Sequence, residues 1–131
     1  MKEYYSLIAE VTCKLAKKPV QVRFKHNKGC TGLCRADSSG LVTIDIEPEL
    51  QSYSKELLEI LLHEIAHAKY DNFQPMSFEV SDSIPFEENY YSMFIECRAE
   101  TQAEAWLWYA ETYRDNNLDY FTGCLKTLLE L

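Results

Sequence analysis

The sequence predicts an α+β fold in a single domain of residues 1–131. Apolar residues recur at steps of three and four in four segments, which is the period of a helix with one buried face. Three short segments between the first two of these are separated by turn sequences, as strands are, and the first of them alternates apolar and polar residues. We therefore expect an N-terminal helix, a small three-stranded, mainly antiparallel sheet and three further helices around one core.

The first helix is expected over residues 2–17, because its apolar side chains share one face and Pro19 follows directly. The expected strands are PVQVRF (residues 19–24), CTGLCRA (30–36) and LVTIDI (41–46), with the turn sequences KHNKG and DSSG between them. Three strands joined by tight turns predict an antiparallel meander, in which neighbours in the sequence are neighbours in the sheet.

Helices make up most of the remaining chain. Ser52 or Ser54 is a suitable cap for a second helix that ends near Tyr70. Residues 71–85 contain two prolines and no sustained period, which indicates a long loop with room for a short strand at 78–80. A third helix of about seven turns is expected from Pro85, which suits a first helical turn, and a final helix over about 119–130.

Charge and cysteine content restrict the environment of the protein. With 13 basic and 21 acidic residues, the formal net charge of −8 opposes binding to nucleic acid or to an anionic membrane. Glu3 and Glu10 interrupt the N-terminal segment where a signal peptide needs an apolar core, and no later run approaches a membrane span. The five cysteines are irregularly spaced, and Cys30 and Cys34 make a poor zinc pair. We expect a cytoplasmic protein with reduced thiols.

The second helix contains the motif HEIAH, in which His63 and His67 are four residues apart. Positions four apart on a helix lie nearly above one another, so both imidazoles can bind one metal ion. Glu64 lies on the same side of the helix and can take a proton from a water at that ion. This pattern predicts a catalytic zinc site, with Zn²⁺ as cofactor and Glu64 as general base.

A catalytic zinc site needs a third protein ligand, and the third helix offers three candidates. Glu96, Glu100 and Glu104 recur at four-residue steps, where like charges repel unless water or a cation neutralises them. Alanines surround the second and third of these, as expected where two helices approach closely. We favour Glu100 as the ligand, with Glu104 accepting an N–H from a zinc-bound histidine. Glu96 and Glu104 stay open as alternative ligands.

The segments LLHEIAHA (residues 61–68) and ETQAEAW (residues 100–106) together resemble the ImmA/IrrE group of gluzincin zinc metallopeptidases. In that family H-E-x-x-H precedes a helix with E-x-x-A-(N/D/E)-x-(F/W), whose first glutamate is the third ligand. The match places Glu100 at that glutamate, and Ala103, Glu104 and Trp106 at the other positions. The likeness covers about residues 1–115 and implies a zincin-like core, with an active-site helix followed by a long ligand helix.

The resemblance implies a zinc metalloendopeptidase that hydrolyses peptide bonds of a protein or peptide substrate, in understood members a repressor or regulatory protein. The strand LVTIDI would then be the edge that pairs with an extended substrate segment. A non-catalytic, zinc-stabilised interaction module of the same fold is the alternative, although such a module has no use for the base Glu64. The identity of the substrate, any activating partner and the oligomeric state are not encoded in these motifs.

The sequence offers several candidate hydrogen-bond donors for the oxyanion that develops during peptide hydrolysis. Tyr70, Tyr90 and Tyr91 lie near the two motifs in the sequence, and Arg35 and Arg98 could orient a substrate carbonyl. Tyrosines at helical spacing more often pack in the core, and surface arginines more often form ion pairs. The sequence therefore does not select one of these residues.

Overall fold

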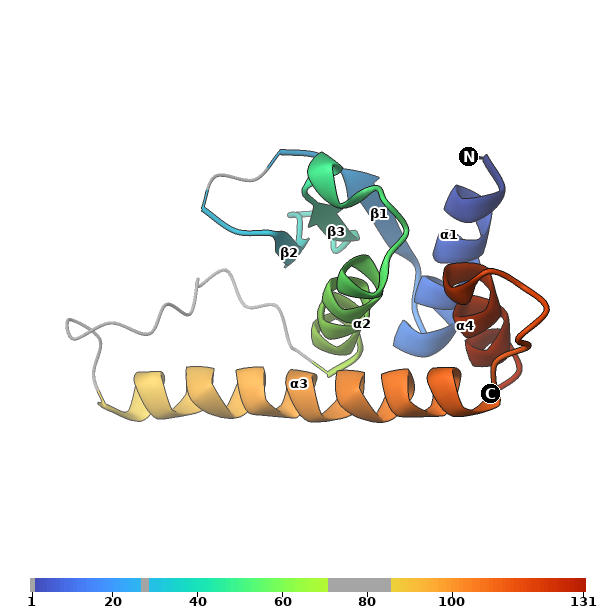
Figure 1. The fold of residues 1–131 in the computed structure, drawn as a ribbon. Helices are drawn as coiled ribbons and strands as arrows, with labels where there is room; N and C mark the ends of the chain where they lie inside the picture. The colour runs from blue at the N-terminus through green and yellow to red at the C-terminus, as the bar shows by residue number, and fades with distance from the viewer. Residues whose placement is uncertain (1, 27–28, 71–85) are drawn as a thin grey trace.

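The computed structural model describes residues 2–26, 29–70 and 86–131, with side chains from residues 4–26, 29–70 and 93–131. The α+β class and the expected order of helices and strands are confirmed. The elements are α1 (Lys2–Ala16), β1 (Val20–Phe24), β2 (Gly32–Ala36), β3 (Val42–Ile46), the short 3₁₀ helix η1 (Pro48–Leu50), α2 (Lys55–Tyr70), α3 (Phe86–Tyr113) and α4 (Tyr120–Leu129) (Figure 1).

The sheet has the strand order β1-β3-β2, so the expected meander is wrong. Strand β3 pairs in parallel with β1, with Val20 opposite Val42, and antiparallel with β2, with Gly32 opposite Ile46. All five residues of β3 are buried, whereas β1 and β2 have exposed positions, which explains why β3 takes the middle of the sheet. The segment LVTIDI is therefore not an edge; the edges are β1 and β2.

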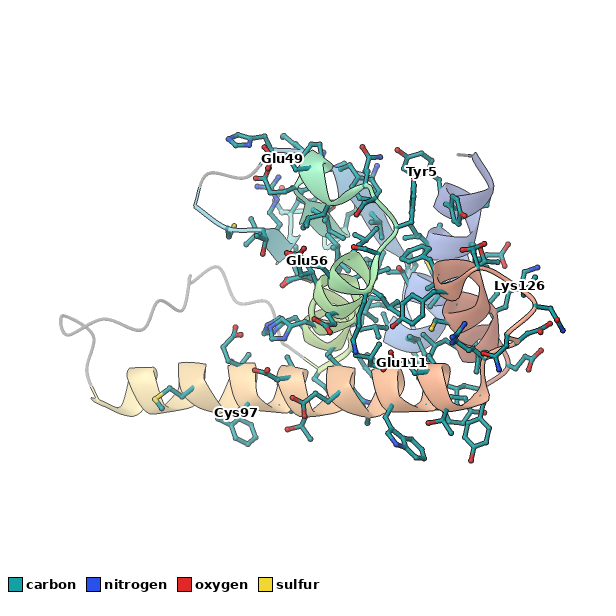
Figure 2. The ribbon with its side chains drawn as sticks, viewed as in Figure 1. Tyr5, Glu49, Glu56, Cys97, Glu111 and Lys126 are labelled. Atoms are coloured by element: carbon teal, nitrogen blue, oxygen red, sulfur yellow. The ribbon has the colours of Figure 1, made fainter. Side chains whose placement is uncertain are left out.

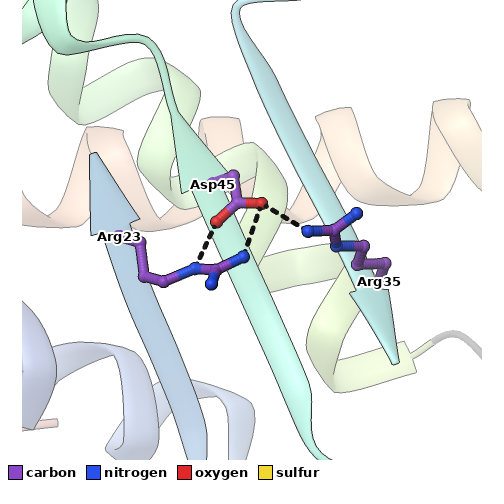
Figure 3. Close-up of polar contacts among 3 residues, drawn as sticks. All are labelled: Arg23, Arg35 and Asp45. Carbon is purple, nitrogen blue, oxygen red and sulfur yellow. Dashed lines mark hydrogen bonds and ion pairs between the residues drawn. The ribbon is translucent and has the colours of Figure 1, made fainter. Parts of the chain in front are cut away.

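Alternate residues of β3 point to the two faces of the sheet. Val42, Ile44 and Ile46 belong to the hydrophobic core. On the other face the buried carboxylate of Asp45 lies between Arg23 of β1 and Arg35 of β2 (Figure 3). This cross-strand ion pair joins all three strands, since each of its members comes from a different one.

Helix α2 is the central helix of the fold and lies between the sheet and α3 (Figure 1). Seven of its apolar residues have no exposed surface, and they fix how the helix is rotated about its axis; they are Leu57, Leu58, Leu61, Leu62, Ile65, Ala66 and Ala68. The rotation determines where the HEIAH motif points. The motif is thus held by the best-buried element of the protein.

Helices α3 and α4 complete the core. Asp119 caps α4 by accepting a hydrogen bond from the backbone N–H of Thr122. Glu111 of α3 accepts a hydrogen bond from the Tyr120 hydroxyl and pairs with Lys55 of α2, so it connects three helices (Figure 2). The expected helix ends agree with the observed ones to within about three residues. The strand expected at 78–80 lies outside the described residues.

None of the described helices combines the length and the apolar composition that crossing a bilayer requires.

Candidate metal centre

Three side chains from α2 and α3 converge at one point. His63 Nε2 lies 3.1 Å from one carboxylate oxygen of Glu96, and His67 Nε2 lies 3.1 Å from the other. The two Nε2 atoms are themselves 3.1 Å apart. Among the described residues, these three form the group whose ligand atoms could hold one metal ion, all within 4.8 Å of one another.

The packing of α2 against α3 produces this convergence. Ala66 on α2 and Ala99 and Ala103 on α3 are buried, and such small side chains allow two helix backbones to approach closely. The close approach places Glu96 across from the turn of α2 that carries His63 and His67. The two imidazoles come from one helix and the carboxylate from its neighbour, so the group depends on tertiary packing as well as on the motif.

The donor set fits a zinc ion. Zinc takes imidazole nitrogen and carboxylate oxygen at about 2.0–2.1 Å in a tetrahedral arrangement, in which neighbouring donor atoms are about 3.3 Å apart. The two Nε2 atoms are 3.1 Å apart, close to that value, and each lies 3.1 Å from a different oxygen of Glu96. Three protein donors leave one tetrahedral position for a water or a substrate atom, as in catalytic rather than structural zinc sites.

Glu96 and the histidines differ in their exposure to solvent. The side chain of Glu96 is 60% exposed, that of His63 28% and that of His67 10%. Hydrogen bonds from His63 and then from His67 hold the pKa of the Glu96 carboxyl well below its usual value. The carboxylate is therefore ionised over the whole range in which imidazoles titrate, and it carries the negative charge that a cation site requires.

Glu64 directly follows His63 in the sequence, but it is not part of the group formed by His63, His67 and Glu96. Its side chain is buried between α2 and strand β2, where Gly32 faces it. The motif helix therefore presents its two histidines to α3 and its glutamate to the sheet.

Glu100 and Glu104, the expected ligand and its expected hydrogen-bonding neighbour, are exposed and do not belong to the converging group. The carboxylate that the structure brings to the histidines is Glu96, one helical turn earlier. The sequence contained a signal for it: Glu96 is in step, at intervals of three and four, with the buried residues Ala99, Ala103, Trp106 and Ala110, and lies at the exposed border of that face.

The other candidates make contacts away from this group. The Tyr70 hydroxyl donates to Gln102, and Arg98 donates to the backbone oxygen of Tyr70 at 3.3 Å. Arg35 is bound to Asp45 on the sheet. The side chains of Tyr90 and Tyr91 lie outside the described residues.

Within the described part of the chain, the remaining histidine and the cysteines supply no second site. His26 contacts Glu47 at 3.1 Å on the surface. Cys30 and Cys34 form no disulfide and do not occur in the candidate metal-binding group found among the described residues. The HEIAH histidines are thus the imidazoles that a metal assignment has to use.

Comparison of this chain with protein-family models, with curated proteins and with solved structures finds no match. A functional assignment therefore depends on the geometry of His63, His67 and Glu96 and on the chemistry of these side chains.

Proposed function

We propose that this chain is a zinc-dependent metallopeptidase that hydrolyses peptide bonds of a protein substrate in the cytoplasm. His63, His67 and Glu96 hold the metal, and Glu64 is the general base. The observation that carries the proposal is the meeting of two motif imidazoles and one carboxylate at separations of 3.1 Å. The likeness of the two motifs to ImmA/IrrE peptidases supports it, with Glu96 in place of Glu100 as the third ligand.

The residues of the chain divide the chemistry among them. His63, His67 and Glu96 would hold the zinc ion, which would supply Lewis-acid polarisation of the substrate carbonyl and a water of near-neutral pKa. The Glu64 carboxylate accepts a proton from the attacking water and then delivers it to the nitrogen of the departing amine. Because Glu64 is buried, bulk water does not compete for that proton.

The free edge of strand β2 is the proposed place for the substrate backbone. In the described part of the chain, β2 pairs with β3 on one side and with no strand on the other. An extended peptide added at that edge would run close to Glu64, since Gly32 of β2 lies against this side chain. A regulatory or repressor protein with an extended, accessible segment suits such a site.

The proposal is tested with wild-type protein and a Glu64→Gln variant, both loaded with zinc. Metal analysis should give one zinc per chain for both, because this substitution leaves the three ligands unchanged. Cleavage of unfolded, fluorescently labelled casein should fall roughly 100-fold or more in the variant, the effect typical of losing a general base. Equal cleavage by both proteins would overturn the mechanism. Zinc binding that raises the melting temperature, with no cleavage by either protein, would favour the interaction module.

A further inference from the structure

We infer that Gly32 is a positioning residue: the absence of a side chain at this point of β2 sets where the Glu64 carboxylate lies. The inference deepens the proposed function and rests on it, because it concerns the general base. It is carried by the contacts between β2 and α2.

The space at Gly32 is already occupied by the side chains of α2. A Cβ atom added there would lie 2.9 Å from Cγ2 of Ile60, 3.2 Å from Cγ of Glu64 and 3.5 Å from its carboxyl carbon. The first distance is too short for two carbon atoms, and the second requires Glu64 to move. Any other residue at position 32 would therefore push the side chain that carries the catalytic carboxylate.

Backbone conformation does not explain this glycine. Gly29 and Gly40 have φ angles of +86° and +88° and open space around them, so they serve as turn glycines. Gly32 is not among the positive-φ residues and pairs regularly with Ile46 in the sheet. Its backbone is open to any residue, and the requirement for glycine comes from space.

The neighbouring residues cannot easily yield. Glu64 is only 7% exposed, and α2 is anchored in the core on both sides of it. Ile60 is β-branched, and its Cγ2 is fixed close to the helix backbone. The other residues of β2 on the same side, Cys34 and Ala36, are also small, so the strand lies close to the helix along its length. An added methyl group would therefore displace Glu64.

The first test compares wild type with Gly32→Ala, Ile60→Ala and the double variant, all loaded with zinc and assayed on casein. Gly32→Ala should bind one zinc, keep KM within about twofold and lose at least roughly tenfold in kcat, as expected for a misplaced catalytic group. Ile60→Ala should be close to wild type. The double variant should stay impaired, because removing Ile60 Cγ2 relieves the contact with Ile60 and leaves the contact with Glu64. Wild-type kcat in zinc-loaded Gly32→Ala would overturn the inference.

The second test is a thermal-stability cycle on the full chain with chelator present, so that neither zinc nor cleavage enters the measurement. Gly32→Ala should lower the melting temperature by about 3 °C or more. In a Glu64→Ala background the same change should lower it clearly less, because the contacted side chain is gone. Equal losses would show that the two residues do not interact and would overturn the inference, whatever Glu64→Gln does to cleavage. A clear coupling together with a fully active Glu64→Gln variant would instead overturn the proposed function.

Discussion

Among the described residues, Asp45 on the sheet and Glu96 between α2 and α3 each lie between two basic side chains, and the two clusters differ in exposure and chemistry. On the sheet, Asp45 accepts hydrogen bonds from Arg23 at 2.8 and 3.1 Å and from Arg35 at 3.1 Å (Figure 3). Between α2 and α3, Glu96 faces His63 and His67 at 3.1 Å each. The distances are nearly the same, so the difference lies in the groups themselves.

Arginine is a donor that stays protonated, whereas a neutral imidazole offers a lone pair. The hydrogen bond to Asp45 raises the pKa of Arg23 above its already high value. The Asp45 side chain is 1% exposed and that of Glu96 60%. The sheet cluster is therefore a closed ion pair that fixes three strands. The helix cluster is open to solvent at Glu96, as the proposed binding of a cation requires.

The largest expected effect is on protein stability, when the cluster of Arg23, Asp45 and Arg35 on the sheet is broken. Arg23→Ala should lower the free energy of unfolding more than any other substitution of this cluster, because the buried Asp45 carboxylate loses its bidentate partner. Arg35→Ala should cost only about 1 kcal/mol, since Arg35 contributes one hydrogen bond and is half exposed. Urea denaturation of both variants checks the ranking. Equal losses in the free energy of unfolding would mean that the two arginines stabilise the Asp45 carboxylate to the same extent.

A somewhat smaller effect is expected on zinc affinity, and it should distinguish Glu96 from Glu100 in α3. Glu96→Gln should weaken zinc binding at least roughly 100-fold, the upper end of what losing even an indirect partner of a metal costs. Glu100→Gln is the matched control, one turn along the same helix, and should bind zinc as the wild type does. Competition titration with a zinc indicator dye measures both constants. If Glu100→Gln weakened zinc binding and Glu96→Gln did not, the third ligand would be Glu100, as the ImmA/IrrE likeness indicates.

Asp119 gives the reference for an exposed carboxylate, whose main partner is the backbone N–H of Thr122, with Tyr4 of α1 as a further partner. Asp119→Ala should cost about 1 kcal/mol at neutral pH through loss of the α4 cap. Hydrogen bonding to the backbone N–H of Thr122 lowers the pKa of Asp119 in the folded chain. Its contribution is therefore complete above about pH 4 and disappears as the pH falls through the lowered value. Unfolding curves for wild type and variant should converge at low pH; a constant difference would contradict the capping role.

The helices of this protein follow from the sequence because each combines an apolar period with clear end signals. Pro19 ends the first helix region, and Asp119 begins the last. Strand order does not follow from such local signals. The turn between β1 and β2 suggested a hairpin, whereas the fully apolar inner face of β3 competes better for the middle of the sheet.

The residues of the candidate site also differ in whether local sequence signals predict them. His63, Glu64 and His67 are identified by spacing within one helix, which depends only on helical geometry. The partner carboxylate depends on how α3 is rotated against α2, and the acidic repeat at four-residue steps offers three equivalent choices. The buried alanine stripe distinguishes them, because Glu96 is in step with Ala99 and Ala103 and meets the histidines, whereas Glu100 lies outside the converging group.

The strand order also matters while the chain is being made. Strands β1 and β2 do not pair with each other, and each forms its hydrogen bonds with β3, which follows both in the sequence. Neither ladder of the sheet can therefore begin to form before Val42, the first residue of β3, has left the ribosome.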